Sequence, residues 1–342
     1  MQKKLIALAV AGLVSVPAFA QSNVTIYGVL DYALNYQRTG NDGDKRYALD
    51  ADGKWNKNGS RIGFRGVEDL GNGLKASFVL EGGFEGDTGR SSQGGRLFGR
   101  QAFGALSGNF GTLAFGRQNT PQYVMYQQQL DPFGVGYAGN VAAVYRIDFR
   151  LDNTVAYVSP SWSGFNVTAA YSFNADGQEV AKDDGNARVW AISPVYNNGP
   201  LYLAANYHQI KSDVSGAEKI KVWDIGGTYD FSVVKVHLGG GKRKYDGTGS
   251  GDPAYDFKNY MAGVTVPVTA AGSVMASYTY TKEDESGKKA NQWAIGYNHN
   301  LSKRTSLYTA FAKRGKDYKE IYNPEMGDPY EKQFQVGVNH KF

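Results

Sequence analysis

The sequence predicts an all-β fold, a 16-stranded antiparallel transmembrane β-barrel. Three observations lead to this prediction. The chain consists of short alternating segments, its short turns alternate with long polar connections, and its last strand ends on an aromatic residue. Successive side chains of a strand point to opposite faces, so apolar residues that alternate with polar ones indicate one face in lipid and one in water.

The N-terminus has the three parts of a secretory signal peptide. Lys3 and Lys4 supply the positive region, residues 5–16 are apolar, and residues 17–20 end in a small-x-small cleavage pattern. The apolar part is too short to span a membrane as a helix. We therefore expect residues 1–20 to be a signal peptide and residues 21–342 to form a single β-barrel pore domain.

Composition excludes several classes of protein. Cysteine is absent, so neither a disulfide scaffold nor a thiolate metal site is possible. Mean hydropathy is −0.44, and after residue 20 no run of 18 apolar residues occurs, which excludes a helical membrane protein. The net charge of +5 is too small to indicate nucleic-acid binding. The 24 Tyr and 17 Phe suit the aromatic belts of a membrane protein.

The first and last strands show the alternation clearly. In a strand from about residue 23 to residue 36, Val24, Ile26 and Leu30 share one parity. In residues 331–342, the even-numbered positions from Phe334 to Phe342 are apolar or aromatic, apart from one histidine. The odd-numbered positions are mostly polar. A bare terminal aromatic is unusual in a soluble domain, whereas a barrel can place it in the interfacial girdle.

The connections between strands set the strand count. Seven short turns contain Gly, Asn, Pro or Ser, near residues 69–73, 107–111, 159–164, 197–200, 230–232, 266–272 and 301–305. Eight long polar connections cover about 37–58, 87–95, 118–147, 174–186, 209–219, 244–255, 282–289 and 314–330. Together they give sixteen strands, which leave an aqueous channel. The alternative, a soluble β-sandwich or β-helix, would not alternate short and long connections so regularly.

Several stretches resemble the trimeric porins of Gram-negative bacteria, of the neisserial and β-proteobacterial type. They are residues 24–31, 60–71, 98–112, 115–118, 152–160, 297–305 and 337–342. No single stretch is diagnostic, but the ordered set covers the chain after residue 20. The resemblance implies a homotrimer in the outer membrane that passes small hydrophilic solutes by diffusion. It also implies that the third external loop folds inward and narrows the pore.

The connection 118–147 is the candidate constriction loop. It is far longer than an ordinary loop and too apolar for a solvated one, so it needs a surface to pack on. Its apolar residues include Tyr123, Met125, Tyr126, Phe133, Tyr137, Val141 and Val144. The inner wall of the barrel offers that surface. The alternative is a loop that caps the barrel mouth or packs on a neighbouring subunit.

Arginines are expected to line the channel, because an arginine that faces lipid at the midplane costs about 2–4 kcal/mol. Arg61 and Arg65 alternate with apolar residues, and Arg150 shares its parity with Asp152. Arg117 has the parity of apolar neighbours, so only the resemblance assigns it to the channel. We expect the pore lining and constriction to comprise Arg61, Arg65, Arg96, Arg100, Arg117, Arg146, Arg150, Lys75, Glu81, Asp131, Asp148 and Asp152.

This set has an excess of fixed positive charge, and arginine stays charged at physiological pH. Rings of Arg and Lys favour anions, so we predict an anion preference. The alternative is a nearly non-selective pore in which Asp31, Glu68, Glu81 and Asp152 neutralise the arginines. A second functional hypothesis is a saturable, substrate-specific channel whose path is lined by Tyr123, Tyr126, Phe133 and Tyr137.

A catalytic function has little support in the sequence. The four histidines lie on separate strands without metal-ligand spacing, and no Ser/His arrangement supports a barrel-form hydrolase. We expect no catalytic residues, cofactor or metal. The run 239–244, GGGKRK, lacks the following helix of a phosphate loop and indicates a basic external patch. Such a patch can attract lipopolysaccharide phosphates or anionic solutes. The expected partners are therefore outer-membrane lipid, lipopolysaccharide and small anionic solutes, together with the two further copies of the chain that the resemblance implies.

Overall fold

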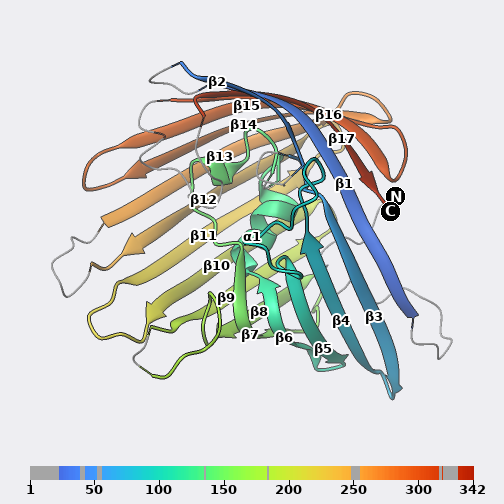
Figure 1. Ribbon diagram of the computed structural model, residues 1–342, viewed down its shortest axis with the longest axis vertical. Helices are drawn as coiled ribbons and strands as arrows, with labels where there is room; N and C mark the ends of the chain where they lie inside the picture. Colours follow the sequence, from blue (N-terminus) through green and yellow to red (C-terminus); the bar gives the residue numbers. More distant parts are fainter. Residues whose placement is uncertain are drawn as a thin grey trace.

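The computed structural model describes residues 23–38, 43–51, 56–134, 136–182, 185–247, 255–315, 318 and 330–342, which form a closed antiparallel barrel (Figure 1). The expected signal peptide lies outside the described residues. Strand β1 (Asn23–Arg38) pairs with the last strand, β17 (Lys332–Lys341), from Val29 opposite Lys341 to Arg38 opposite Lys332. This pairing joins the two ends of the sheet and closes the barrel.

From β3 to β17 each strand pairs antiparallel with its neighbours along the chain, while β2 and β3 both pair with β1. Their bounds are β2 (Lys45–Asp50), β3 (Arg61–Gly71), β4 (Leu74–Gly83), β5 (Gln101–Gly108), β6 (Gly111–Asn119), β7 (Arg150–Val158), β8 (Phe165–Ser172), β9 (Ala187–Asn198), β10 (Leu201–Ser212), β11 (Lys219–Asp230), β12 (Lys235–Tyr245), β13 (Tyr255–Pro267), β14 (Gly272–Glu283), β15 (Lys289–Asn300) and β16 (Thr305–Arg314).

The predicted count of sixteen strands is confirmed, although the described residues contain seventeen strand segments. Strands β2 and β3 share one position in the wall, because β1 pairs with β3 over Asn23–Val29 and with β2 over Ala33–Arg38. Between them, the carboxylate of Asp31 on β1 accepts hydrogen bonds from the backbone amide of Gly59 (3.0 Å) and from the hydroxyl of Tyr308 (2.8 Å).

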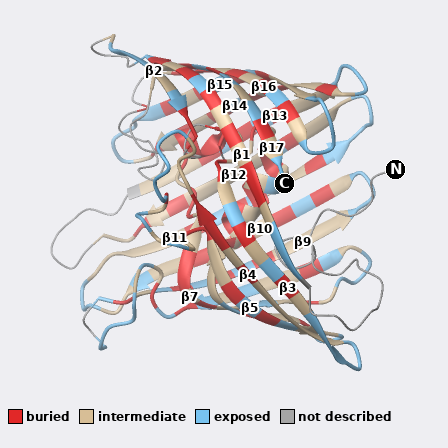
Figure 2. Cartoon of the chain, turned by 45° about the vertical axis from the view of Figure 1, so that its right-hand side comes forward, coloured by how far each residue is buried: buried red, intermediate tan, exposed pale blue. Residues whose placement is uncertain are grey.

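Burial along the strands is inverted relative to a soluble protein. On β11, Ile225 is 69% exposed, whereas its neighbour Asp224 is 3% exposed. Figure 2 shows this alternation of buried and exposed residues along the strands. Apolar side chains therefore cover the outside of the barrel and polar ones fill its interior, as lipid and water require. Within the described residues, no helix is long and apolar enough to cross a membrane.

Residues 120–149 connect β6 to β7 and are hereafter called the inner segment. They contain α1 (Pro121–Met125), the π-helical turn η2 (Tyr126–Leu130) and the 3-10 turn η3 (Val141–Ala143). The hydroxyl of Thr120 caps α1 by accepting a hydrogen bond from the amide of Tyr123 (3.0 Å), and Pro121 occupies the first turn. In Figure 1, α1 lies within the ring of strands.

Candidate pore constriction

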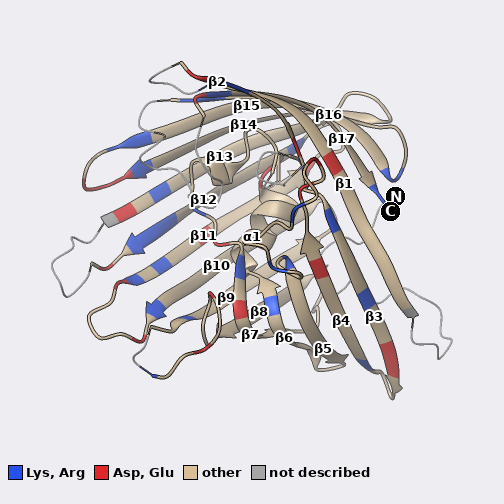
Figure 3. Cartoon of the chain, in the orientation of Figure 1, with Lys and Arg blue, Asp and Glu red and all other residues tan. Residues whose placement is uncertain are grey.

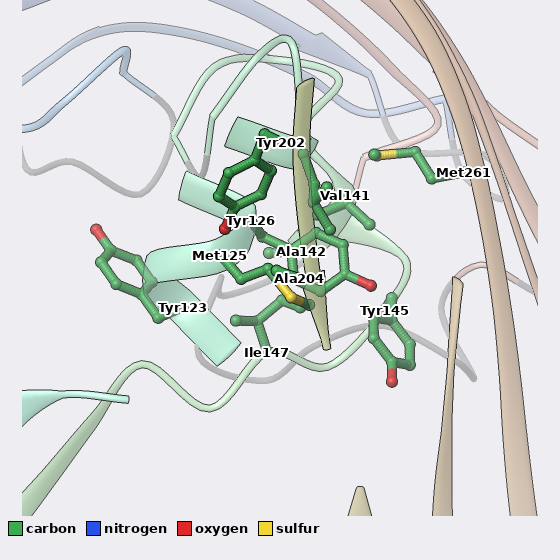
Figure 4. Close-up of a cluster of buried hydrophobic side chains, with 11 residues drawn as sticks. Tyr123, Met125, Tyr126, Val141, Ala142, Tyr145, Ile147, Tyr202, Ala204 and Met261 are labelled. Carbon is green, nitrogen blue, oxygen red and sulfur yellow. The ribbon is translucent and has the colours of Figure 1, made fainter. Parts of the chain in front are cut away.

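The inner segment packs on the wall through a buried apolar cluster. The cluster joins residues of the segment, among them Met125 and Tyr126, to Tyr202 and Ala204 of β10 and Met261 of β13 (Figure 4). Met125 and Tyr126 are almost completely buried. This packing explains why the sequence of the segment is so apolar: its side chains leave water by contacting the barrel wall.

Glycines in the wall permit the close approach of Leu130. A Cβ added to Gly226 on β11 would lie 2.6 Å from Cδ1 of Leu130, and one added to Gly239 on the adjacent β12 would lie 3.5 Å from it. Gly226 and Gly239 are direct partners in the sheet. The pair therefore forms a shallow seat in which Leu130 rests directly on backbone.

Buried polar contacts fix the same side of the inner segment. Asp148 accepts hydrogen bonds from Arg243 on β12 (2.6 and 3.3 Å), and its carboxylate lies 2.8 Å from Nε2 of His208 on β10. Burial alone would raise the pKa of Asp148, but the charge of Arg243 and the hydrogen bond from His208 outweigh it and hold the pKa well below its ordinary range. Asp148 therefore stays ionised and engaged with the wall.

Asp224 on β11 forms a second polar anchor. Its carboxylate accepts hydrogen bonds from the hydroxyls of Tyr126 (3.2 Å) and Tyr145 (3.0 Å) and from the amide of Gln122 (3.0 Å). All three donors belong to the inner segment, which encloses this buried carboxylate. The segment is thus held to β10–β12 by both apolar and charged contacts.

The other side of the inner segment reaches β15–β17. The backbone amide of Ala138 donates to Gln335 of β17, and the side chain of Gln292 on β15 donates to the carbonyl of Asn140 (2.9 Å). The rings of Tyr137 and Tyr308 meet edge to face with centroids 5.1 Å apart. The segment therefore contacts the wall on β10–β13 and again on β15–β17.

The arginines predicted from the sequence gather on β3–β7. Glu81 on β4 lies 2.7 Å from Arg100 and 3.6 Å from Arg61, and it accepts a hydrogen bond from the hydroxyl of Tyr27 (3.0 Å). The guanidinium of Arg65 lies over the ring of Tyr27, 5.1 Å from its centroid. These five side chains form one cluster inside the wall.

Asp152 joins the second arginine group. It lies 2.8 Å from Arg96 and 2.5 Å from Arg117. Arg96 and Arg100 precede β5, which begins at Gln101, so strand alternation does not orient them. Arg117 lies at a β-bulge between Gly116, with φ of 125°, and Gln118. The extra residue breaks the parity, which explains why simple alternation did not place Arg117.

Arg146 and Arg150 complete the arginine face. Nε of Arg146 lies 3.7 Å from Asp148, and the guanidinium of Arg150 lies over the ring of Tyr123, 5.6 Å from its centroid. Among the described residues, no carboxylate forms an ion pair with Arg150, and its buried Nε has no hydrogen-bond partner. Within the described part of the chain, Arg150 is thus a charge without an ion-paired carboxylate.

A cavity of about 940 Å³ lies against this face. Its lining holds six arginines and three acidic residues, so positive charge is in excess. They are Arg90, Arg96, Arg100, Arg117, Arg146 and Arg150, with Glu85, Asp148 and Asp176. Tyr123 also lines this cavity. Figure 3 shows the distribution of charge over the barrel.

Lys75 and Asp131 lie away from the arginine face. Lys75 lines a separate cavity of about 660 Å³, and Leu151 borders both cavities. Asp131 is buried within the inner segment, where it accepts hydrogen bonds from the amides of Val141 (2.6 Å) and Phe133 (2.9 Å). Burial raises its pKa to about 7. Asp131 therefore holds the fold of the segment together.

Sequence reasoning missed Arg243 and His208, which hold Asp148. Arg243 belongs to the run interpreted as an external basic patch, yet its side chain is buried inside, whereas Lys242 and Lys244 point outward. The alternation of β12 could have separated Arg243 from its neighbours. Among the described residues, no group of three His, Asp or Glu side chains could hold a metal ion.

Comparison with known proteins gives consistent matches. The family model described as Gram-negative porin matches residues 7–318. Outer membrane porin protein 32 of Delftia acidovorans is 36% identical and an outer membrane porin protein of Bordetella pertussis 34% identical, each over the full length of both chains. The structure of an anion-selective porin from Comamonas acidovorans has a TM-score of 0.79 and 32% identity, covering 94% of this chain and all of that one. OmpT of Vibrio cholerae in a trimer form, at 16% identity and a TM-score of 0.70 over 94% of this chain and 99% of that one, shares the fold.

Proposed function

The chain belongs to the family of Gram-negative porins, and on that premise we propose that it is a general diffusion channel of the outer membrane with a preference for anions. The path runs between the inner segment and the arginine face. Solutes pass by diffusion, so the proposal contains no catalytic step and no resident cofactor or metal. The proposed pore-lining set is the twelve residues expected from the sequence except Asp131, which is buried and holds the inner segment together, and Lys75 lies beyond the arginine face.

The charge balance at the arginine-lined cavity carries this proposal. Six arginines line it against three acids, and Asp148, one of the three, is already engaged by Arg243. Asp152 and Glu81 each bridge two arginines, so they neutralise only part of the charge. A fixed positive excess in a narrow aqueous path raises the local concentration of anions. This balance favours anion preference over the non-selective alternative.

The burial of most aromatic side chains of the inner segment argues against a saturable, substrate-specific channel. Tyr126, Phe133 and Tyr137 are buried between the inner segment and the wall, so they offer no surface to a passing solute. Tyr123 alone of the four residues in that hypothesis lines the arginine cavity. A single aromatic side chain does not form a stacking path. We therefore expect conductance that rises linearly with solute concentration.

Replacement of Arg150 by glutamine tests the proposal. Because Arg150 has no ion-paired carboxylate, the variant removes one positive charge and exposes no new negative one. We expect the ratio of anion to cation permeability, measured from reversal potentials in planar bilayers, to fall. Lys303→Gln, in the exposed turn between β15 and β16, removes the same charge outside the cavity and serves as the control. Equal ratios in wild type and Arg150→Gln would refute the proposed role of the arginine face.

We also propose that residues 1–20 are cleaved as a signal peptide and that the mature chain assembles as a homotrimer. The trimer form in which a porin-fold neighbour has been solved supports this assembly. Cross-linking of the purified protein is expected to give a species of three covalently joined chains. Without cross-linker, denaturing electrophoresis is expected to show a three-chain species in the unheated sample and single chains after heating. Mass spectrometry of the same sample would locate the mature N-terminus.

A further inference from the structure

The cavity of about 660 Å³ that Lys75 lines has a different chemistry from the arginine cavity. We call it the amide chamber, because six amide side chains and eight hydroxyl side chains line it. Within its described lining, Lys75 is the one charged residue. The amides are those of Asn109, Gln118, Asn119, Gln128, Gln129 and Asn166. Neutral hydrogen-bonding groups therefore replace fixed charge in this part of the barrel.

The two cavities follow one another along the barrel. The lining of the arginine cavity includes residues 90–96 and 175–176, which belong to the long connections after β4 and β8. The lining of the amide chamber includes residues 107–109 and 158–161, which lie at the short turns after β5 and β7. Leu151 borders both cavities. A solute that leaves the arginine face toward the short turns therefore enters the amide chamber next.

Asn119 and Arg150 mark the junction of the two cavities. They are direct partners in the pairing of β6 with β7, and residues opposite one another have Cβ atoms about 4.5–5.5 Å apart. Arg150 lines the arginine cavity, and Asn119 lines the amide chamber. Among the described residues, Oδ1 of Asn119 is buried without a hydrogen-bond partner, so this amide is not committed to the protein there. An anionic group at Arg150 therefore places the rest of its solute beside Asn119.

Further along the chamber, Asn166 and Thr168 stand two residues apart on β8 and share its inner face. Neither side chain hydrogen-bonds to another residue in the described part of the chain. Val158 and Val195 line the same chamber and offer contact to C–H groups. A polyhydroxylated carbon chain presents donors, acceptors and C–H groups together, and so matches this lining.

An aliphatic chain of the same length fits the chamber less well. It would displace water from the amides and hydroxyls without replacing the lost hydrogen bonds, and polar groups left without partners are unfavourable. A hydroxylated chain replaces those bonds as it moves. The chamber therefore distinguishes two anions of equal charge and similar length by the chemistry of the part that carries no charge.

We propose that the channel passes hydroxylated carboxylates, such as sugar acids, more readily than aliphatic carboxylates of the same length. The carboxylate stays near the arginine face while the hydroxyl groups exchange hydrogen bonds with the amide chamber. This inference rests on the proposed anion preference and names the class of anion that the channel favours. Single neutral hydrogen bonds are weak in water, so passage remains diffusive and conductance remains linear in solute concentration.

The test compares gluconate with hexanoate, which are both six-carbon monocarboxylates. Reversal potentials of the purified protein in planar bilayers are measured with the potassium salt of each anion on one side and KCl on the other, at about pH 8. We expect the permeability of gluconate to exceed that of hexanoate by about two- to tenfold, the range that one net hydrogen bond supplies.

Asn119→Leu and Thr168→Val each remove hydrogen-bonding groups from the chamber with little change in side-chain volume. We expect each variant to lower the ratio of gluconate to hexanoate permeability toward one. Two separate variants keep the test decisive if one of them fails to insert. Asn300→Leu removes an exposed amide at the end of β15, outside both cavities, and serves as the control that retains the wild-type ratio.

Equal permeability of gluconate and hexanoate in the wild type would overturn the proposal. So would an unchanged ratio in the chamber variants, or an equal fall of the ratio in Asn300→Leu. The ratio of chloride to potassium permeability in the wild type tests the proposed function separately. A channel that prefers chloride but passes gluconate and hexanoate alike would refute this inference alone, whereas a preference for potassium would refute both.

Discussion

Replacing Arg243 by methionine is expected to reduce anion preference, although Arg243 does not line the arginine cavity. The guanidinium is 1% exposed as a side chain and donates two hydrogen bonds to Asp148. Removing one partner of a buried ion pair costs about 3–5 kcal/mol, because the other charge stays buried and uncompensated. Asp148 can relieve that energy by turning toward Arg146, which already lies 3.7 Å away. There its charge would oppose the arginine face.

A double-mutant cycle separates this mechanism from a direct effect of the lost positive charge. Reversal potentials in a KCl gradient are measured for wild type, Arg243→Met, Asp148→Asn and the double variant. We expect Arg243→Met to lower anion preference in the wild-type background but to have little effect once Asp148 is neutral. Arg243→Lys keeps the charge without the two-pronged geometry and should fall between wild type and Arg243→Met. An equal effect of Arg243→Met in both backgrounds would refute the reasoning.

Three further changes test the inner segment. Gly226→Val should clash with Leu130 and destabilise the inner segment by about 1–3 kcal/mol, which would lower the unfolding temperature and make the single-channel current noisier. Gly104→Ala, where the added methyl group has space, is the control and should behave like wild type. Burial raises the pKa of Asp131 from 3.8 to about 7, so its contribution to stability is full below 3.8 and is lost as pH rises to about 7. The free energy of unfolding of the wild type should therefore fall between about pH 5 and about pH 8. In Asp131→Asn this fall should be smaller by about 2–3 kcal/mol, and a fall equal to that of the wild type would contradict the raised pKa of Asp131. Tyr123→Ala should widen the path and raise single-channel conductance, so equal conductance would show that Tyr123 does not border the bottleneck.

The barrel itself could be predicted because its physics is local. A period of two along each strand indicates which side chains meet lipid. Arg61, which alternates with apolar residues, lies beside the buried Glu81, while its neighbour Ile62 is exposed on the outside. The strand count followed from turn chemistry, which is also local. The sequence does not show that β2 and β3 share one position in the wall. That arrangement depends on which strand pairs with each half of β1, and this pairing is not a local property of the sequence.

The contacts of the inner segment could not be predicted in this way. Asp148 meets Arg243 across 95 residues of chain, and neither residue carries a periodic signal that points to the other. Alternation could not orient the side chain of Arg117 for a different reason. The β-bulge inserts one residue into the strand there and so reverses the parity on which the inference depends. Alternation therefore identifies which residues enter the barrel, and only the folded chain shows which of them remain unpaired there.

The reversal potential of the unmodified protein in a planar bilayer under a KCl gradient tests the central claim most directly. A fixed excess of guanidinium charge along the arginine face predicts a sign that corresponds to greater permeability for chloride than for potassium. A sign that corresponds to potassium preference, or a potential of zero, would show that the carboxylates on the path outweigh or cancel the arginines and would contradict the account.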